Sequence, residues 1–173
     1  MATRQAELVQ ECKRLSESCL YTSTTFFVWL KFLHAVKGTL TVLGVVLGGF
    51  AGWNVLTGAG DATARIIVAV SALGAGLIPT IISALKLSEH IEDCRRLAGE
   101  FKNLQDRFRQ AALVWARKEF GEFEKEFISS RDRLETARAE SITPPEWCFK
   151  RAQSKVKAQD YTFDVDLESG QSS

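Results

Sequence analysis

The stretch GTLTVLGVVLGGFAGWNVL, residues 38–56, contains no charged residue, and neither does IIVAVSALGAGLIPTIISAL, residues 66–85. As a helix, each stretch would be about 28–30 Å long, which matches the hydrocarbon core of a bilayer, about 30 Å. Charged residues nevertheless make up 25% of the 173-residue chain, so they are concentrated outside these two stretches. We therefore interpret the stretches as two membrane spans joined by a short connector, residues 57–65, rather than as core helices of a soluble protein.

Aromatic and basic residues flank both predicted spans. Trp29, Lys37, Trp53, Arg65 and Lys86 lie near the span ends, where amphipathic rings and long basic side chains anchor a helix at the membrane surface. Basic residues are more frequent on the side of the two termini than in the connector. The positive-inside rule then predicts that both termini lie in the cytoplasm.

Glycine destabilises a helix in water by roughly 1 kcal/mol relative to alanine, but in lipid small residues allow helices to pack closely. Each predicted span carries a stripe of small residues: Thr41, Gly44, Gly48 and Gly52 on the first, and Ala72, Gly76, Thr80 and Ser83 on the second. Two interpretations are open: the stripes pack on each other within one hairpin, or they form contacts between subunits or the wall of a pore. Pro79 removes one backbone hydrogen bond from the second span and should kink it. The kink is either a hinge or a static bend.

Helices are also predicted on both sides of the spans. Residues 1–37 form an amphipathic helix that reaches the membrane interface. After the second span a seven-residue apolar repeat predicts a helix packed against other helices, and its broad stripe favours a bundle. The predicted seam consists of Leu87, Ile91, Leu97, Phe101, Leu104, Phe108 and Trp115. We expect one cytoplasmic rod over 86–140, continuous with the second span, with a kink near Gly121; its partner is the N-terminal helix or a neighbour's rod.

The segment ITPPEW, residues 142–147, has the residues that start a helix. Thr143 is a candidate N-cap, Pro144 suits the first turn, and Glu146 completes a capping box, which predicts a short helix over 144–158. Residues 159–173 are predicted to be a largely disordered tail. Its segment 161–167 alternates apolar and polar residues as a strand does, and is a candidate for docking onto the edge of a partner's sheet.

Motifs of catalysis and of metal binding are missing from the sequence. It contains no phosphate-binding loop, no GxSxG, no HExxH, and no cysteine and histidine spacing typical of a metal site. The two spans contain no ionisable residue, which argues against a proton-coupled transporter. We expect no enzyme activity, no cofactor or metal, and no nucleic-acid partner. The four cysteines are interpreted as small, half-buried apolar residues in a reducing compartment.

Residues 11–38 (ECKRLSESCLYTSTTFFVWLKFLHAVKG), 85–108 (LKLSEHIEDCRRLAGEFKNLQDRF) and 142–153 (ITPPEWCFKRAQ) resemble the SLATT family, the two-span effectors of bacterial conflict and antiphage systems. The resemblance implies an all-α membrane domain over residues 1–158. It also implies an effector that oligomerises in the bacterial inner membrane, permeabilises it and kills the cell when a sensor protein activates it. Because no sensor domain is recognisable here, the signal would arrive through a separate protein that docks on the cytoplasmic helices or on segment 161–167.

Two other functions are compatible with the same spans. In a membrane-anchored scaffold, the hairpin only tethers the cytoplasmic helices. In a small constitutive channel, the spans conduct without harming the cell.

Overall fold

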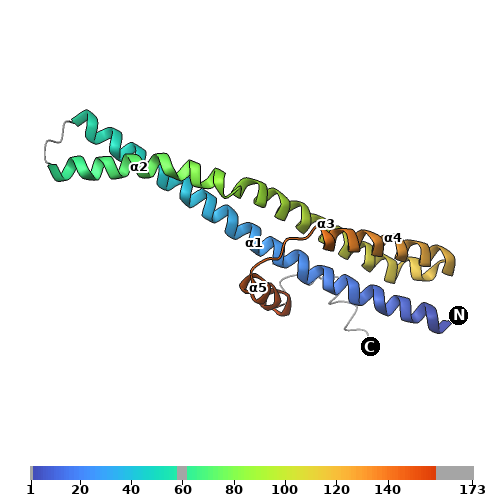
Figure 1. The fold of residues 1–173 in the computed structure, drawn as a ribbon. Coiled ribbons are helices and arrows are strands. Elements are labelled where there is room, and N and C mark those ends of the chain that lie inside the picture. The colour runs from blue at the N-terminus through green and yellow to red at the C-terminus, as the bar shows by residue number, and fades with distance from the viewer. Residues whose placement is uncertain (1, 58–61, 159–173) are drawn as a thin grey trace. The chain divides into compact units, whose positions relative to one another are not determined.

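The computed structural model describes residues 2–57 and 62–158, and within these ranges the chain is all-helical, without a strand. The predicted all-α class is thus confirmed for these ranges, whereas the expectations for the tail and for segment 161–167 lie outside them. The elements are α1 (Ala2–Thr57), α2 (Ala62–Ala84), α3 (Leu87–Leu113), the 3-10 turn η1 (Trp115–Arg117), α4 (Phe120–Ala139) and α5 (Glu146–Lys157) (Figure 1).

The chain divides into two compact units. We call Met1–Trp29 with Cys94–Ser173 the bundle unit, and Leu30–Asp93 the apolar unit. Residues of α1 belong to both units, and so do residues of α3.

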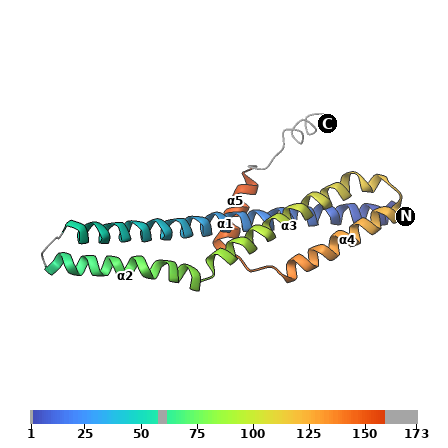
Figure 2. The same cartoon turned by 90° about the horizontal axis from the view of Figure 1, so that it is seen from above.

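In the apolar unit, the second half of α1 and all of α2 lie side by side (Figures 1 and 2). Gly44 of α1 faces Ile78 of α2, whereas Gly48, later in α1, faces Ala75, earlier in α2. The two segments are therefore antiparallel. Helix α2 begins at Ala62, so residues 62–65, which we expected in the connector, are already helical.

In the bundle unit, the first half of α1 packs against α3, and α4 runs back along α3. The Phe26 and Phe101 rings stack with centroids 5.8 Å apart, and Ser16 Oγ donates a hydrogen bond to the Gln105 carbonyl (3.1 Å). The fully buried large side chains of this unit come from α1, α3, α4 and α5: Cys12, Cys19, Phe26, Cys94, Leu97, Phe101, Leu104, Phe108, Phe123, Leu134 and Cys148. The side chains of four helices therefore form its core.

The prediction of one rod continuous with the second span is wrong at its start. Helix α2 ends at Ala84, and a separate helix, α3, begins at Leu87. Lys86 has a left-handed backbone conformation (φ 48°), which costs a non-glycine residue roughly 1–2 kcal/mol. The Lys86 amide donates to the Ser83 carbonyl (3.0 Å), and the His90 amide donates to the Lys86 carbonyl (3.0 Å), which begins α3. The usual sequence signal for such an ending is glycine, and lysine occupies that place here.

The rod is also wrong near Gly121, where the chain reverses instead of kinking. Residues 114–119 form η1 and an extended link, and α4 then runs antiparallel to α3 (Figures 1 and 2). The change of phase in the apolar repeat marked the correct position. It did not show that α4 buries its own apolar side chains, Phe123, Phe127 and Leu134, in the same bundle.

The last helix was predicted at the right place, but its capping was not. Helix α5 begins at Glu146 with Pro145 as N-cap, and no side chain caps it. The residue before a proline is driven into an extended conformation, which affects Thr143 before Pro144 and Pro144 before Pro145. The helix can therefore start no earlier than Pro145, and Pro145 itself is extended (φ −57°, ψ 145°) and serves as the N-cap. The predicted Thr143 capping box does not form.

Candidate helix-packing and membrane surfaces

Helices α1 and α2 expose nearly all of their most apolar segments. Each contains an 18-residue segment long and apolar enough to cross a membrane, and only 6% of that segment in α1 and 11% in α2 is buried. The core helix of a soluble protein would bury most of such a segment. The exposed side chains include Val45, Val46, Phe50, Ile66, Val70, Leu73 and Leu77. An apolar surface of this extent marks a site of association with lipid or protein.

The contact between α1 and α2 contains small residues from both helices. A Cβ atom placed on Gly48 would lie 3.6 Å from Cβ of Ala75, and one on Gly74 would lie 3.2 Å from Cδ1 of Leu47. Ala51, Ser71 and Ile78 are buried in the apolar unit. The absence of a side chain at Gly74 and the small residues Gly48 and Ala75 thus allow the two helices to approach closely.

The predicted stripe on α1 is only partly at this contact. Gly44 and Gly48 face α2, but Thr41 and Gly52 are exposed, and a Cβ on Gly52 would meet nothing within 4 Å. The Thr41 hydroxyl instead donates to the Lys37 carbonyl of its own helix (2.8 Å). The true contact is turned by about one residue around α1, toward Leu47 and Ala51.

The predicted stripe on α2 lies on the side of the helix turned away from α1. Ala72, Gly76, Thr80 and Ser83 are all exposed, and a Cβ on Gly76 would meet no atom within 4 Å. The packing of this stripe against α1 within one hairpin was therefore a wrong expectation. Its alternative role, between subunits or along a pore, stays a prediction.

Helix α2 has small residues on two of its sides. Because both sides are similarly apolar, hydropathy does not indicate which of them packs against α1. Ser71, Gly74 and Ala75 form the contacting set that the sequence interpretation missed. Pro79 lies inside α2, which continues through it. The Thr80 hydroxyl donates to the Gly76 carbonyl at 3.4 Å, so this exposed polar group has a partner on its own helix.

The predicted interface anchors are found in varied surroundings. Trp29 is half-buried, and Trp53 and Arg65 are exposed. Lys37 Nζ donates to Ser88 Oγ (2.9 Å), and Lys86 Nζ pairs with Glu89 Oε2 (3.2 Å). Their role at a membrane surface stays a prediction.

The predicted seam of α3 faces helices of its own chain. Leu87, Ile91, Leu97, Phe101, Leu104 and Phe108 are buried, and Trp115 in η1 is half-buried. The Lys118 ammonium lies 4.0 Å from the centroid of the Trp115 ring. Since Phe101 stacks on Phe26, the N-terminal helix of the same chain, rather than a neighbour's rod, is the partner at this position.

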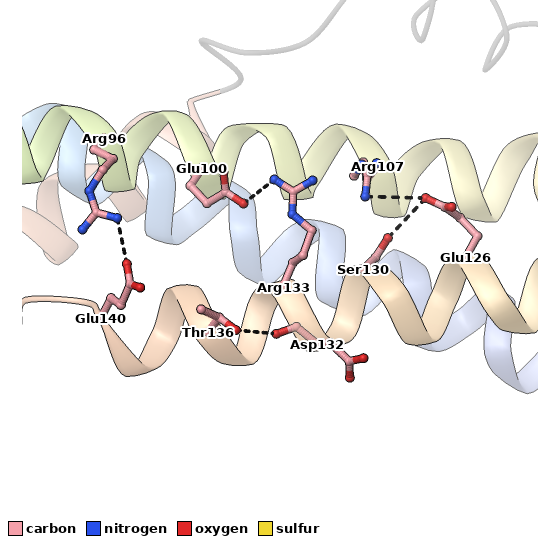
Figure 3. A network of polar contacts seen from close by, with 9 residues as sticks. All are labelled: Arg96, Glu100, Arg107, Glu126, Ser130, Asp132, Arg133, Thr136 and Glu140. Atoms are coloured by element: carbon pink, nitrogen blue, oxygen red, sulfur yellow. Dashed lines mark hydrogen bonds and ion pairs between the residues drawn. The ribbon is translucent and has the colours of Figure 1, made fainter.

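Ion pairs join α3 to α4 along the bundle surface (Figure 3). Arg96 pairs with Glu140 and Glu100 pairs with Arg133, both with N–O distances of 2.7 Å. Arg107 Nη1 lies 3.9 Å from Glu126 Oε1, and Ser130 Oγ donates a hydrogen bond to the same oxygen (3.5 Å). Such partly exposed pairs contribute at most about 1 kcal/mol each, so the buried apolar side chains, and not these pairs, provide most of the stability of this contact.

The four cysteines are free and buried. Burial raises the pKa of the Cys12 thiol to about 11, with a smaller contribution from Glu11, and burial raises the pKa of Cys19 to about 11 against the opposing effect of Arg138. Burial also raises the pKa of Cys148. Among residues 2–57 and 62–158, no three side chains are grouped as metal ligands. These thiols therefore serve as small apolar groups of the core.

Comparison with known proteins finds no protein family, no curated protein and no solved structure that matches this chain.

Proposed function

We propose that this chain is a two-span membrane protein that self-associates in the bilayer and permeabilises it, as the resemblance to SLATT effectors implies. The observation that carries the proposal is the exposure of α1 and α2: two helices of membrane-spanning length bury only 6% and 11% of their most apolar segments. Lipid is the solvent in which such surfaces are stable without further protein. Both termini would lie in the cytoplasm of a bacterial cell.

The outward face of α2 supports self-association. Helices in lipid associate by close packing at small residues, and Ala72, Gly76, Thr80 and Ser83 provide such a face that α1 leaves uncovered. Activation by a sensor protein would rearrange the bundle unit and bring these faces of several subunits together. A pore lined by Thr80 and Ser83 would discriminate poorly between ions, because it contains no charged ring.

The test is inducible expression in bacteria with a membrane-potential dye. We expect the unmodified chain to depolarise the cells. Gly76→Leu should weaken assembly about tenfold or more, because overpacking a close helix contact costs typically 1–3 kcal/mol, and should reduce depolarisation accordingly. The fold of the single chain should tolerate this change, because a Cβ on Gly76 meets no atom within 4 Å.

Gly49→Leu is the matched control, because Gly49 of α1 is also exposed and has no atom within 4 Å of a Cβ. It should depolarise as the unmodified chain does. An unmodified chain without conductance in liposomes would instead favour the anchored scaffold. Conductance with harmless expression would favour the constitutive channel. Equal depolarisation by Gly76→Leu and the unmodified chain would exclude the α2 face from assembly.

A further inference from the structure

Helix α5 has the most unbalanced charge of the helices around α3. It contains four basic residues and one acidic residue, whereas α3 contains five of each and α4 contains four basic and five acidic residues. The basic residues of α5 are Lys150, Arg151, Lys155 and Lys157. Two of them lie in its last turn, where cations are favoured by the helix dipole. That effect explains the end of the helix, but not the basic residues before it.

Three of the four basic residues of α5, Lys150, Arg151 and Lys157, are exposed, whereas Lys155 is half-buried. Cys148 and Ala152 bury the opposite side in the bundle unit. Because successive residues turn by about 100°, Lys150 and Lys157 share the middle of the exposed face. Trp147 and Phe149, toward the two edges of that face, are 41% and 48% exposed. Basic residues together with large exposed aromatic rings are typical of helices that lie on a membrane surface.

Most of this positive charge is not neutralised within the ranges 2–57 and 62–158. Lys150 Nζ pairs with Glu146 Oε1 at 2.9 Å, and both side chains are largely exposed. Arg151, Lys155 and Lys157 form no ion pair with any residue of these ranges. The surface is therefore complementary to an anionic one.

Helix α5 follows the end of the bundle unit at which α3 begins. Glu140, six residues before α5, pairs with Arg96 (2.7 Å), and Arg96 lies two residues after Cys94, the first residue of α3 in the bundle unit. The chain enters the bundle unit from the apolar unit at this residue. The link to α5 thus starts beside the first turn that α3 contributes to the bundle unit.

We propose that α5 is a membrane-surface helix that binds anionic phospholipid headgroups through Lys150, Arg151 and Lys157, with Trp147 and Phe149 at the level of the interface. The inference rests on the proposed function, because α1 and α2 would hold α5 near the bilayer. Lipid is favoured over an acidic protein because two large exposed aromatic rings border the basic residues. Binding would fix the bundle unit against the membrane.

The test is hydrogen exchange of the full chain in vesicles of phosphatidylcholine, alone or mixed with phosphatidylglycerol. Backbone amides of α5 should exchange more slowly in the anionic vesicles, and high salt should abolish the difference. Lys150→Gln/Lys157→Gln should reduce the lipid-dependent protection, by about fivefold for each lysine. Lys13→Gln/Lys125→Gln is the matched control, since both lysines are exposed on α1 and α4, and it should keep the protection.

Equal exchange of α5 in both vesicles, with α1 and α2 protected, would overturn the inference and leave the proposed spans intact. A substitution effect of equal size in both vesicles would also overturn it, because a protein segment rather than anionic lipid would then cover α5. Free exchange of α1 and α2 would reject the spans instead. In that case flotation of the chain with anionic but not neutral vesicles would still support α5 binding, and failure to float would overturn it.

Discussion

At the scale of single residues, the glycines of α1 and α2 act in two different ways. At Gly74 a placed Cβ would lie only 3.2 Å from Leu47, and at Gly48 it would already be in van der Waals contact with Ala75 (3.6 Å), so neither position has room for a large side chain. Gly52 and Gly76 have no neighbour within 4 Å of a placed Cβ. Replacing a glycine by a larger residue should therefore destabilise the single chain at the first pair of positions and change its stability little at the second pair.

Gly48→Leu should destabilise the contact between α1 and α2 by about 1–3 kcal/mol, because a bulky side chain has to fit where Ala75 lies in van der Waals contact. Gly76→Leu should change the stability of the single chain little, since the added atoms extend away from α1. Denaturant unfolding of both variants in detergent micelles measures the difference. An equal loss of stability in the two variants would contradict the placement of these glycines.

The buried cysteines predict a pH dependence. A pKa of about 11 for Cys12 and Cys19 leaves roughly a hundredfold less thiolate below pH 9 than the ordinary thiol has. We expect native labelling by iodoacetamide to be slower than in the unfolded chain by at least this factor. The folded chain keeps protons between pH 9 and 11 that the unfolded chain loses, so stability is complete below pH 9 and declines as pH rises toward 11. Fast native labelling at pH 8 would show that these thiols are accessible.

At the scale of elements, the seven-residue repeat predicted which face of α3 is buried, because the core of the bundle unit is built from that periodicity. The ends of the elements could not be predicted as well. Lys86 occupies a left-handed conformation that glycine usually marks. The chain reverses direction after Leu113, and the only sign of this in the sequence is a change of phase in the apolar repeat. The helices themselves follow from local patterns, whereas their turns depend on contacts between residues far apart in the chain.

The stacking of α1 on α3 gives a prediction at this scale. Phe26 is 1% exposed and stacks on Phe101, whereas the adjacent Phe27 is 39% exposed. Phe26→Ala should cost about 3–5 kcal/mol of unfolding free energy, the usual loss for a buried phenylalanine. Phe27→Ala, the control, should cost far less. Thermal unfolding followed by circular dichroism measures both, and similar losses would contradict the α1–α3 interface.

At the scale of the whole molecule, the uneven distribution of charge was the most informative property of the sequence. It predicted two helical segments without charge, residues 38–56 and 66–85, and the structure exposes most of their apolar side chains. It did not predict which side of α2 meets α1, because Ala72 and Gly76 are as small as Gly74 and Ala75. Hydropathy indicates which segment is suited to lipid, but shape complementarity between two helices decides which face of the segment packs against the other helix.

Whether α1 and α2 cross a bilayer can be measured by alkaline carbonate extraction of a membrane fraction, followed by flotation of the pellet through a density gradient. We expect the full chain to stay with the lipid and to float with it after extraction, because two apolar spans of about 30 Å are not released by high pH. Release of the chain into the carbonate supernatant would show that the two helices do not span the membrane.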